Sequence, residues 1–233
     1  YMWKILIYMG IKKIIAFGSA KGGVGKSSIT ASIAKSLSKN YRVGILDADI
    51  YGPNQHLLFK INEKLDLRNR VIKPFKKNNI KIISMGFIID DDAAATWRGP
   101  MLSSAIKQLI NSTDWGDLDY LLIDMPPGTG DSYLTIFKEL DVDHFIIISS
   151  INSLSVSDSN RTISMLNKLN VNILGYIENN IFNVNCKEDN DLFKTKNINK
   201  LGAFTFHSEI YDFDPDYDCN EANEISKQIM EIA

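Results

Sequence analysis

A glycine-rich segment near the N-terminus carries the strongest chemical signal of the sequence. Residues 19–28 read SAKGGVGKSS, between an apolar run and an amphipathic stretch. Glycines let successive backbone N–H groups turn toward one point, and a helix that begins there adds the positive end of its dipole. The pattern predicts a loop that binds nucleotide phosphates through Gly22, Gly23, Val24, Gly25, Lys26, Ser27 and Ser28.

Three side chains of this loop have separate predicted tasks. Lys26 would bridge the β- and γ-phosphates, the hydroxyl of Ser27 would coordinate Mg²⁺, and Ser28 would reach the α-phosphate. The ligands that fit these tasks are ATP and Mg²⁺.

Acidic residues follow two of the apolar runs. Asp47 and Asp49 end the second run, and the alternation of side chains places both on one face. Asp49 is the candidate for positioning the attacking water, and Asp47 for supporting Mg²⁺ from behind its direct ligands. Asp124 ends the run LLID and is expected to hold Mg²⁺ through a water molecule. In the loop that follows, Gly128 is expected to present its N–H to the γ-phosphate.

The elements that must position these residues follow from the apolar pattern. Nearly continuous runs of four to six apolar residues are typical of strands buried on both faces of a parallel sheet, and they alternate here with helical patterns. The expected strands are 13–18, 42–47, 80–85, 120–124, 144–149 and 173–177, and the expected helices include 27–39, 101–110, 155–169 and 221–233.

This alternation predicts an α/β fold, a three-layer P-loop NTPase with a mostly parallel central sheet flanked by helices. Residues 11–233 are expected to form a single domain behind an uncertain N-terminal extension, 1–10, with a shortened C-terminal region from about residue 181. Residues 86–96 read as a solvated loop, and 183–200 as a loop or poorly formed helix, with its helical part at 194–200.

Composition narrows the partners. The chain has 233 residues, 45% of them hydrophobic, and a formal net charge of −2. A dedicated nucleic-acid binder would be strongly basic, and no apolar run approaches the roughly 20 residues of a membrane span. Two cysteines cannot form a disulfide scaffold, which indicates a reducing compartment. We therefore expect a cytoplasmic protein with neither a nucleic acid nor a membrane as its partner.

Taken together, these motifs resemble those of the Mrp/ApbC family of P-loop ATPases, the iron–sulfur cluster carriers. The resemblance covers about residues 11–180. It rests on the second lysine, Lys21, which marks a deviant phosphate-binding loop, and on the matching stretches 21–28, 43–54, 97–101, 115–120, 122–131 and 175–179. It implies ATP hydrolysis in a homodimer, with Lys21 reaching the nucleotide of the partner subunit, and a [4Fe–4S] cluster held between subunits for transfer to acceptor or scaffold proteins. It also implies that Asn179 contacts the adenine edge.

The sequence departs from that pattern in its last quarter. Family members carry a Cys-x-x-Cys pair after the segment that ends at Asn179, whereas this chain has only Cys186 there. Two thiolates per dimer are fewer than the four that usually hold a [4Fe–4S] cluster. The second cysteine, Cys219, lies farther along the chain. The adenine-contacting Gly-x-Ile-Pro of relatives reads Gly-Ala-Phe-Thr at 202–205, without its proline.

Three functions therefore stay open at this stage. The leading one is an ATPase whose nucleotide state drives assembly and transfer of an iron–sulfur cluster, with Lys21, Lys26, Asp49 and Asp124 as catalytic residues. The second is a positioning switch similar to MinD and ParA, and the third a nucleotide-binding scaffold that has lost its cluster site. Against the second, the polar side of the terminal helix is acidic, which anionic lipids would repel.

Overall fold

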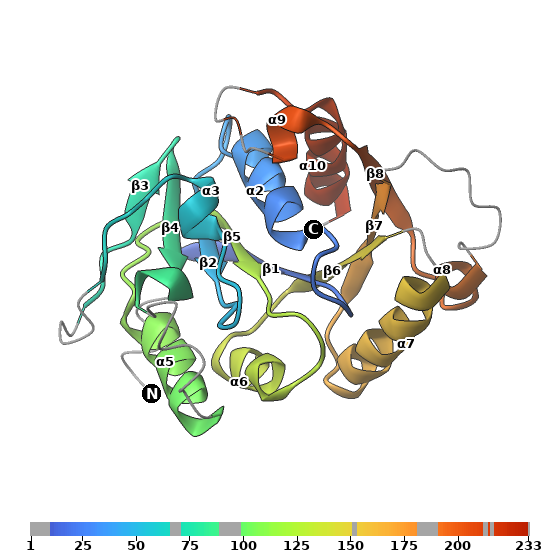
Figure 1. Cartoon of the computed structure of the whole chain (residues 1–233), viewed down its shortest axis with the longest axis horizontal. Coiled ribbons are helices and arrows are strands. Elements are labelled where there is room, and N and C mark those ends of the chain that lie inside the picture. The colour runs from blue at the N-terminus through green and yellow to red at the C-terminus, as the bar shows by residue number, and fades with distance from the viewer. Residues whose placement is uncertain are drawn as a thin grey trace.

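The computed structural model describes residues 10–65, 71–88, 99–150, 153–180, 191–211, 214 and 217–232. They form one twisted sheet covered by helices on both faces (Figure 1). Among them, no helix is both long and apolar enough to cross a membrane.

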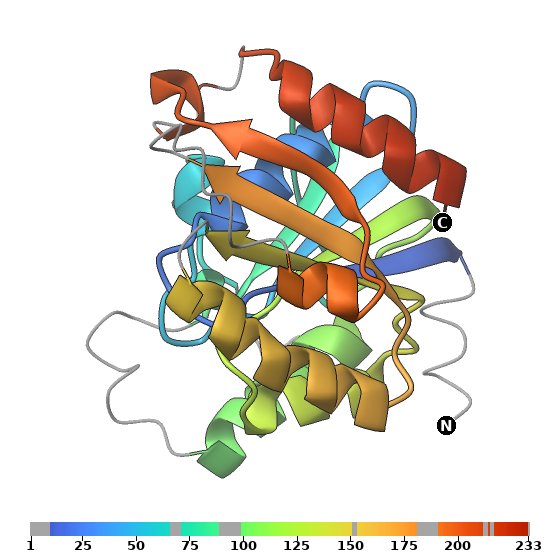
Figure 2. The same ribbon diagram turned by 90° about the vertical axis from the view of Figure 1, so that its right-hand side faces the viewer.

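The sheet has eight strands in the order β3-β4-β2-β5-β1-β6-β7-β8. All neighbouring pairs are parallel except β3 and β4, which are antiparallel at one edge. The strands are β1 (Ile11–Gly18), β2 (Val43–Asp47), β3 (Phe75–Lys77), β4 (Ile80–Ser84), β5 (Leu118–Asp124), β6 (His144–Ser150), β7 (Ile173–Asn180) and β8 (Lys200–Thr205). Parallel neighbours end at the same edge, and Figure 2 shows their arrowheads at one side of the molecule.

The helices divide into two layers. On one face lie α2 (Lys26–Leu37), α9 (Ser208–Tyr211) and α10 (Asn220–Ile232), and on the other α5 (Gly99–Ser112), α6 (Asp131–Glu139), α7 (Ser153–Lys168) and α8 (Asp191–Thr195) (Figures 1 and 2). The short α3 (Gln55–Leu58) and the 3₁₀ turn η1 (Met85–Phe87) follow β2 and β4.

The core consists of two apolar clusters, one on each face of the sheet. Alternate residues of β1 serve opposite clusters: Ala16 belongs to the cluster that contains Ile106 of α5, whereas Phe17 belongs to the one that contains Ile33 of α2 and Ile225 of α10. A strand that supplies both clusters needs apolar residues at consecutive positions, which explains the continuous runs of the sequence.

The predicted fold class is confirmed, and each of the six expected strands is present and has a parallel neighbour. The sequence pattern does not predict the edge strands β3 and β8. The expectation that Gly86 lies in a solvated loop is wrong: Met85–Phe87 is a buried turn, and the Ser84 hydroxyl accepts a hydrogen bond from the N–H of Gly86. Residues 89–96 of that expected loop lie outside the described residues.

The expected helix at 194–200 is also wrong. The helix there, α8, lies earlier and ends at Thr195, Asn197 has a left-handed backbone, and Lys200 opens β8. Phe193 explains the earlier start, because its ring is buried and stacks on that of Tyr176, with centroids 4.0 Å apart.

Candidate functional site

Four of the predicted site segments meet at the carboxyl edge of the sheet. β1 leads into residues 19–28, β2 ends at Asp47, β5 ends at Asp124, and β7 carries Asn179. The register places Asp124 beside both Phe17 of β1 and Asp47 of β2. This edge is where open α/β sheets bind their ligands.

The glycine-rich loop has the geometry that its sequence predicts. Gly23 and Gly25 have φ angles of 77° and 80°, in the left-handed region that favours glycine, and α2 begins at Lys26. A Cβ on Gly25 would lie 2.4 Å from Nδ2 of Asn179. That Nδ2 donates to the carbonyl of Val24 at 2.8 Å. Asn179 therefore holds the loop from the side, in addition to its predicted role at the adenine.

Lys26 is buried among carboxylates. Its Nζ forms an ion pair with Oδ1 of Asp124, and it lies 4.0 Å from Oδ2 of Asp49 and 3.4 Å from Oγ of Ser27. Burial acts to lower the pKa of Lys26, but the charge of Asp124 and its hydrogen bond outweigh this, so the pKa lies above its ordinary value. The side chain therefore carries its positive charge at this edge despite its burial.

Asp47 organises the loop that follows β2. Its carboxylate accepts hydrogen bonds from the Ser84 hydroxyl at 2.7 Å and from the backbone N–H groups of Asn54 and Gln55 at 3.0 Å. Burial, followed by the nearby charge of Asp124, raises the pKa of Asp47. These bonds fix the position of the loop that carries Asp49.

Asp49 lies at the wall of the cavity next to this loop. Its side chain is buried, and its Oδ1 accepts from the N–H groups of Tyr51 and Gly52 at 3.1 and 3.2 Å. Burial raises its pKa, while the charge of Lys26 opposes that rise. A carboxylate held in this way can orient a water molecule, which is the role predicted for it.

Two predicted phosphate contacts have other partners in this structure. The N–H of Gly128 donates to the carbonyl of Ser19 at 3.1 Å, so a contact with phosphate requires this bond to break. Lys21 pairs with Asp158 of α7 in the same chain, with Nζ and Oδ2 3.0 Å apart.

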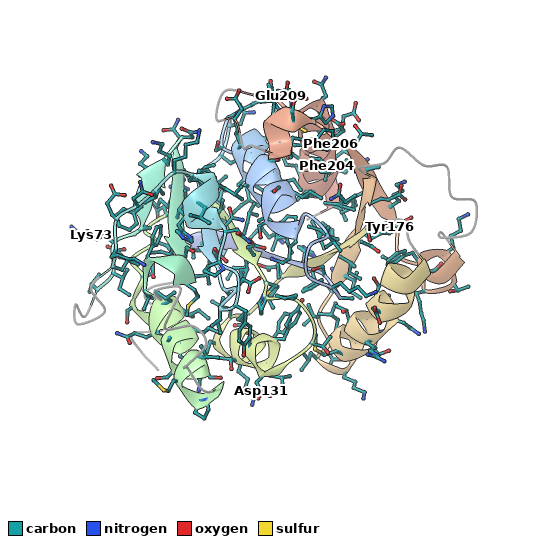
Figure 3. The ribbon with its side chains drawn as sticks, viewed as in Figure 1. Lys73, Asp131, Tyr176, Phe204, Phe206 and Glu209 are labelled. Carbon is teal, nitrogen blue, oxygen red and sulfur yellow. The ribbon has the colours of Figure 1, made fainter. Side chains whose placement is uncertain are left out.

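A cavity of about 420 Å³ connects the phosphate loop with the end of β8. That volume lies in the range of small-molecule sites. At one end are residues of the loop with Asp49, and at the other are Phe204, Thr205, Phe206, His207 and Ile210. Phe206 is 57% exposed, and Figure 3 shows Phe204 and Phe206 beside α9, the helix that carries Glu209.

Two parts of this site are not predicted from the sequence. The segment 202–205 is expected near the adenine from its resemblance alone, and no pattern singles out Phe206 or His207, which follow it. Gln55 was also missed, although its side chain contacts Asp124. A single glutamine in a Pro-Asn-Gln-His stretch carries no periodic signal that separates it from an ordinary loop residue.

The cysteines lie apart from the described cavity or outside the described residues. Cys186 falls in the segment 181–190, which the structure does not describe. Cys219 is buried in the core, and its sulfur accepts from the N–H of Ala222 at 3.4 Å. Burial raises the pKa of its thiol to about 11, which disfavours the thiolate that metals bind. The described part of the chain contains no group of three His, Cys, Asp or Glu residues placed to hold a metal ion.

Comparison with known families gives one match across nearly the whole chain. The family described as "ParA: NUBPL iron-transfer P-loop NTPase" matches residues 10–231.

Curated relatives carry related descriptions. The chain is 44% identical over 203 residues to an iron–sulfur cluster carrier protein of Rickettsia felis, covering 87% of this chain and 64% of that protein. It is 42% identical over 199 residues to an iron–sulfur cluster carrier protein of Pseudomonas fragi, covering 83% of this chain and 69% of that protein. An iron–sulfur protein of Arabidopsis thaliana, described as mitochondrial and required for NADH dehydrogenase, is 40% identical, covering 83% of this chain and 64% of that protein.

Solved structures share the fold. A nucleotide-binding protein of Archaeoglobus fulgidus in complex with ADP superposes with a TM-score of 0.76 at 26% identity, covering 97% of this chain and 92% of that one. The cell division ATPase MinD of Pyrococcus furiosus has a TM-score of 0.74 at 17% identity, covering 95% and 99% of the two chains.

Proposed function

The chain belongs to the NUBPL iron-transfer group of ParA-type P-loop NTPases, and we propose that it is an ATP-hydrolysing iron–sulfur cluster carrier that acts as a cytoplasmic homodimer. It spans about two thirds of the length of the Rickettsia felis relative, so its activity, substrates and partners are all part of this proposal.

One observation carries the nucleotide-binding part of the proposal. A single cavity joins the phosphate loop to a wall of apolar and aromatic residues at the end of β8. Phosphates would lie at the loop, where N–H groups and the start of α2 favour negative charge. The base would lie against Phe206, which is exposed and offers flat apolar surface at the other end, while Phe204 is buried in the core.

The residues at the loop fit Mg²⁺. Hydroxyl and carboxylate oxygens are its preferred ligands, and Ser27 and Asp124 supply them next to a buried lysine that is held charged. A bound Mg²⁺ would neutralise charge on the β- and γ-phosphates. Ser27 and Asp124 would hold it, the latter through water.

Hydrolysis is the addition of water to the γ-phosphate, with ADP as the leaving group. Asp49 orients that water, and Lys26 moves from Asp124 to the phosphates and stabilises the negative charge that they gain. Both side chains already border one another, with Nζ of Lys26 4.0 Å from Asp49.

The cavity opens beside exposed apolar side chains, which suit a second copy of the chain. Leu57 of α3 lines the cavity and is 60% exposed, and Tyr51, in the loop between β2 and α3, is 71% exposed. A homodimer would cover both, and Lys21 would exchange Asp158 for the nucleotide of the partner. The acidic terminal helix α10 is less suited to a membrane, because Ala222, Ile225 and Ile229 are buried in the core.

The cluster is the cargo of this proposal, and Cys186 is its proposed ligand. The test is anaerobic reconstitution of the full chain with iron and sulfide, followed by visible absorption and an iron count per dimer. The wild type should gain cluster absorption, and Cys186→Ala should lose it, whereas Cys219→Ala should keep it. A cluster that survives Cys186→Ala would overturn the ligand assignment.

A nucleotide-binding scaffold without a cluster is the second candidate, favoured by the presence of one cysteine, Cys186, between β7 and β8 where the family carries a pair. A wild type that hydrolyses ATP but holds no iron would support it over the carrier.

A further inference from the structure

Gln55 occupies a buried position between the two residues proposed to hold Mg²⁺. It is the first residue of α3, its side chain is fully buried, and its backbone N–H donates to Asp47. Its side-chain Nε2 donates to Oδ2 of Asp124 at 2.8 Å and to the carbonyl of Ser27 at 3.0 Å. One amide group therefore links β5 to the first turn of α2.

The orientation of this amide follows from its neighbours. Both Asp124 and the Ser27 carbonyl are acceptors, so the NH₂ group must face them and uses both of its hydrogens there. Oε1 is then left buried, and it has no hydrogen-bond partner in the structure. A buried oxygen without a donor is costly, which favours a water molecule or a ligand-bound water as its partner.

The carboxylate of Asp124 is shared between two donors. Oδ1 pairs with Lys26, and Oδ2 accepts from Gln55. When Lys26 moves to the phosphates, Oδ1 becomes free for a water of Mg²⁺, while Gln55 keeps Oδ2 in place. If Gln55 were replaced, Lys26 would be the one donor left of these two, and its movement to the phosphates would leave the Asp124 carboxylate without either.

We propose that Gln55 is a positioning residue for Mg²⁺, which holds Asp124 and the first turn of α2 in the geometry that the metal needs. This inference rests on the proposed binding of ATP with Mg²⁺. Both hydrogens of the Gln55 NH₂ group are used by Asp124 and the Ser27 carbonyl, so Gln55 acts on the metal through these residues rather than on the nucleotide itself.

The test compares nucleotide affinity with and without metal. A fluorescent ADP analogue is titrated into the full chain in EDTA and across a Mg²⁺ series, for the wild type, Gln55→Met and the matched control Gln228→Met on the exposed side of α10. Gln55→Met keeps the length of the side chain and removes its donors. This variant should need at least tenfold more Mg²⁺ to reach half of the Mg²⁺-dependent change in affinity for the ADP analogue. Its affinity for the analogue in EDTA should stay within twofold of the wild type.

Several outcomes would overturn the inference. An unchanged Mg²⁺ requirement in Gln55→Met would do so, and so would an equal loss of affinity with and without Mg²⁺, which indicates only a structural role. If Mg²⁺ does not change the affinity of the wild type for the ADP analogue, the proposed function is wrong, and the role proposed for Gln55 is wrong as well. That failure is visible before any variant is made.

A second measurement does not depend on the folding of Gln55→Met. The chain contains three glutamines, Gln55, Gln108 and Gln228, so selective ¹⁵N labelling gives three pairs of side-chain NH₂ signals, one pair for each residue. Gln108→Met and Gln228→Met identify the signal of Gln55 by elimination. Addition of Mn²⁺ with ADP should broaden that signal and leave the signal of Gln228 sharp. A Gln55 signal that stays sharp would place the amide away from the metal and overturn the inference.

Discussion

Nζ of Lys21 lies 3.0 Å from Oδ2 of Asp158, which is on α7 of the same chain. The family resemblance assigns Lys21 to the nucleotide of a partner subunit, so this pair shows where the lysine rests in the single chain. Both side chains are partly exposed, at 42% and 31%. Exposed ion pairs contribute only about 0–1 kcal/mol, so phosphate can compete with Asp158 for this lysine.

Replacement of Lys21 should separate binding from hydrolysis. Lys21→Ala should retain some nucleotide binding, because Lys26 and the N–H groups of the loop remain, but it should lose ATP turnover. Its unfolding free energy should stay within about 1 kcal/mol of the wild type. Phosphate release and urea unfolding measure the two effects. In the control Asp158→Asn, which removes the ion pair but keeps Lys21, turnover should persist, and its loss would contradict the assigned role.

Replacement of Lys26 should affect both function and stability. Lys26→Ala should abolish Mg²⁺-dependent turnover, because this is the buried positive charge beside Asp49 and Asp124. Loss of one partner of a buried pair typically costs about 3–5 kcal/mol, since the other charge stays buried. Phosphate release and urea unfolding at neutral pH measure the two losses. Retained turnover in both Lys26→Ala and Lys21→Ala would refute the deviant phosphate-loop assignment.

The sequence pattern predicts the inner strands and the placement of the carboxylates for one physical reason. Strands buried on both faces must be apolar throughout, so the runs that end at Asp47 and Asp124 are easily recognised. Because parallel strands end at one edge, both acids were expected at that edge, and the strand order, with β2 beside β5, makes them neighbours. The pattern does not predict β8, because Lys200, Gly202 and Thr205 interrupt the apolar run of this edge strand.

The partners of individual side chains are harder to predict. Gln55 acquires its contacts only when the loop after β2 packs against β5, which are far apart in the sequence. Lys21 and Gly128 have partners within the chain, Asp158 and the Ser19 carbonyl, which the proposed nucleotide contacts would replace. A motif predicts which residues contact a ligand, but it does not predict what these residues contact when no ligand is bound.

The contact between Gly25 and Asn179 predicts a variant that is rescued by a second one. Gly25→Ala should weaken nucleotide binding strongly, because the new Cβ would meet Nδ2 of Asn179 at 2.4 Å and φ is 80°. The left-handed backbone alone costs about 1–2 kcal/mol for alanine. Asn179→Ala in the Gly25→Ala background should restore part of the affinity and stability, since it removes the clash.

A double-mutant cycle on unfolding free energies, with nucleotide titration in parallel, checks this. Asn179→Ala alone should cost about 0.5–1.5 kcal/mol for the lost bond to the carbonyl of Val24. Gly130→Ala is the matched control, because Gly130 lies outside the phosphate loop, its φ is −82° and an added Cβ would meet no atom within 4 Å. Strictly additive effects in the double variant would show that the two residues do not clash.

A polar network at the start of α10 should make the free energy of unfolding depend on pH in the acidic range. Oε1 of Glu221 accepts from Nε2 of His207 at 2.7 Å and from the Thr205 hydroxyl at 3.0 Å. Burial acts to raise the pKa of Glu221, but these hydrogen bonds and one from the backbone outweigh it and lower the pKa to about 2. The ordinary value is 4.5, so the folded state holds the proton less tightly than the unfolded state.

The sign of the effect follows from this difference. The contribution of Glu221 to stability is complete above pH 4.5 and is lost as the pH falls toward about 2. After allowance for solvent screening, it is on the order of 1 kcal/mol. Unfolding free energies measured in urea should therefore fall less steeply between pH 5 and about 2.5 in Glu221→Gln than in the wild type. Glu224→Gln, on the exposed side of the same helix, should keep the wild-type slope. If Glu221→Gln and Glu224→Gln change the slope equally, the slope reflects the net charge of α10 rather than the bond between Glu221 and His207.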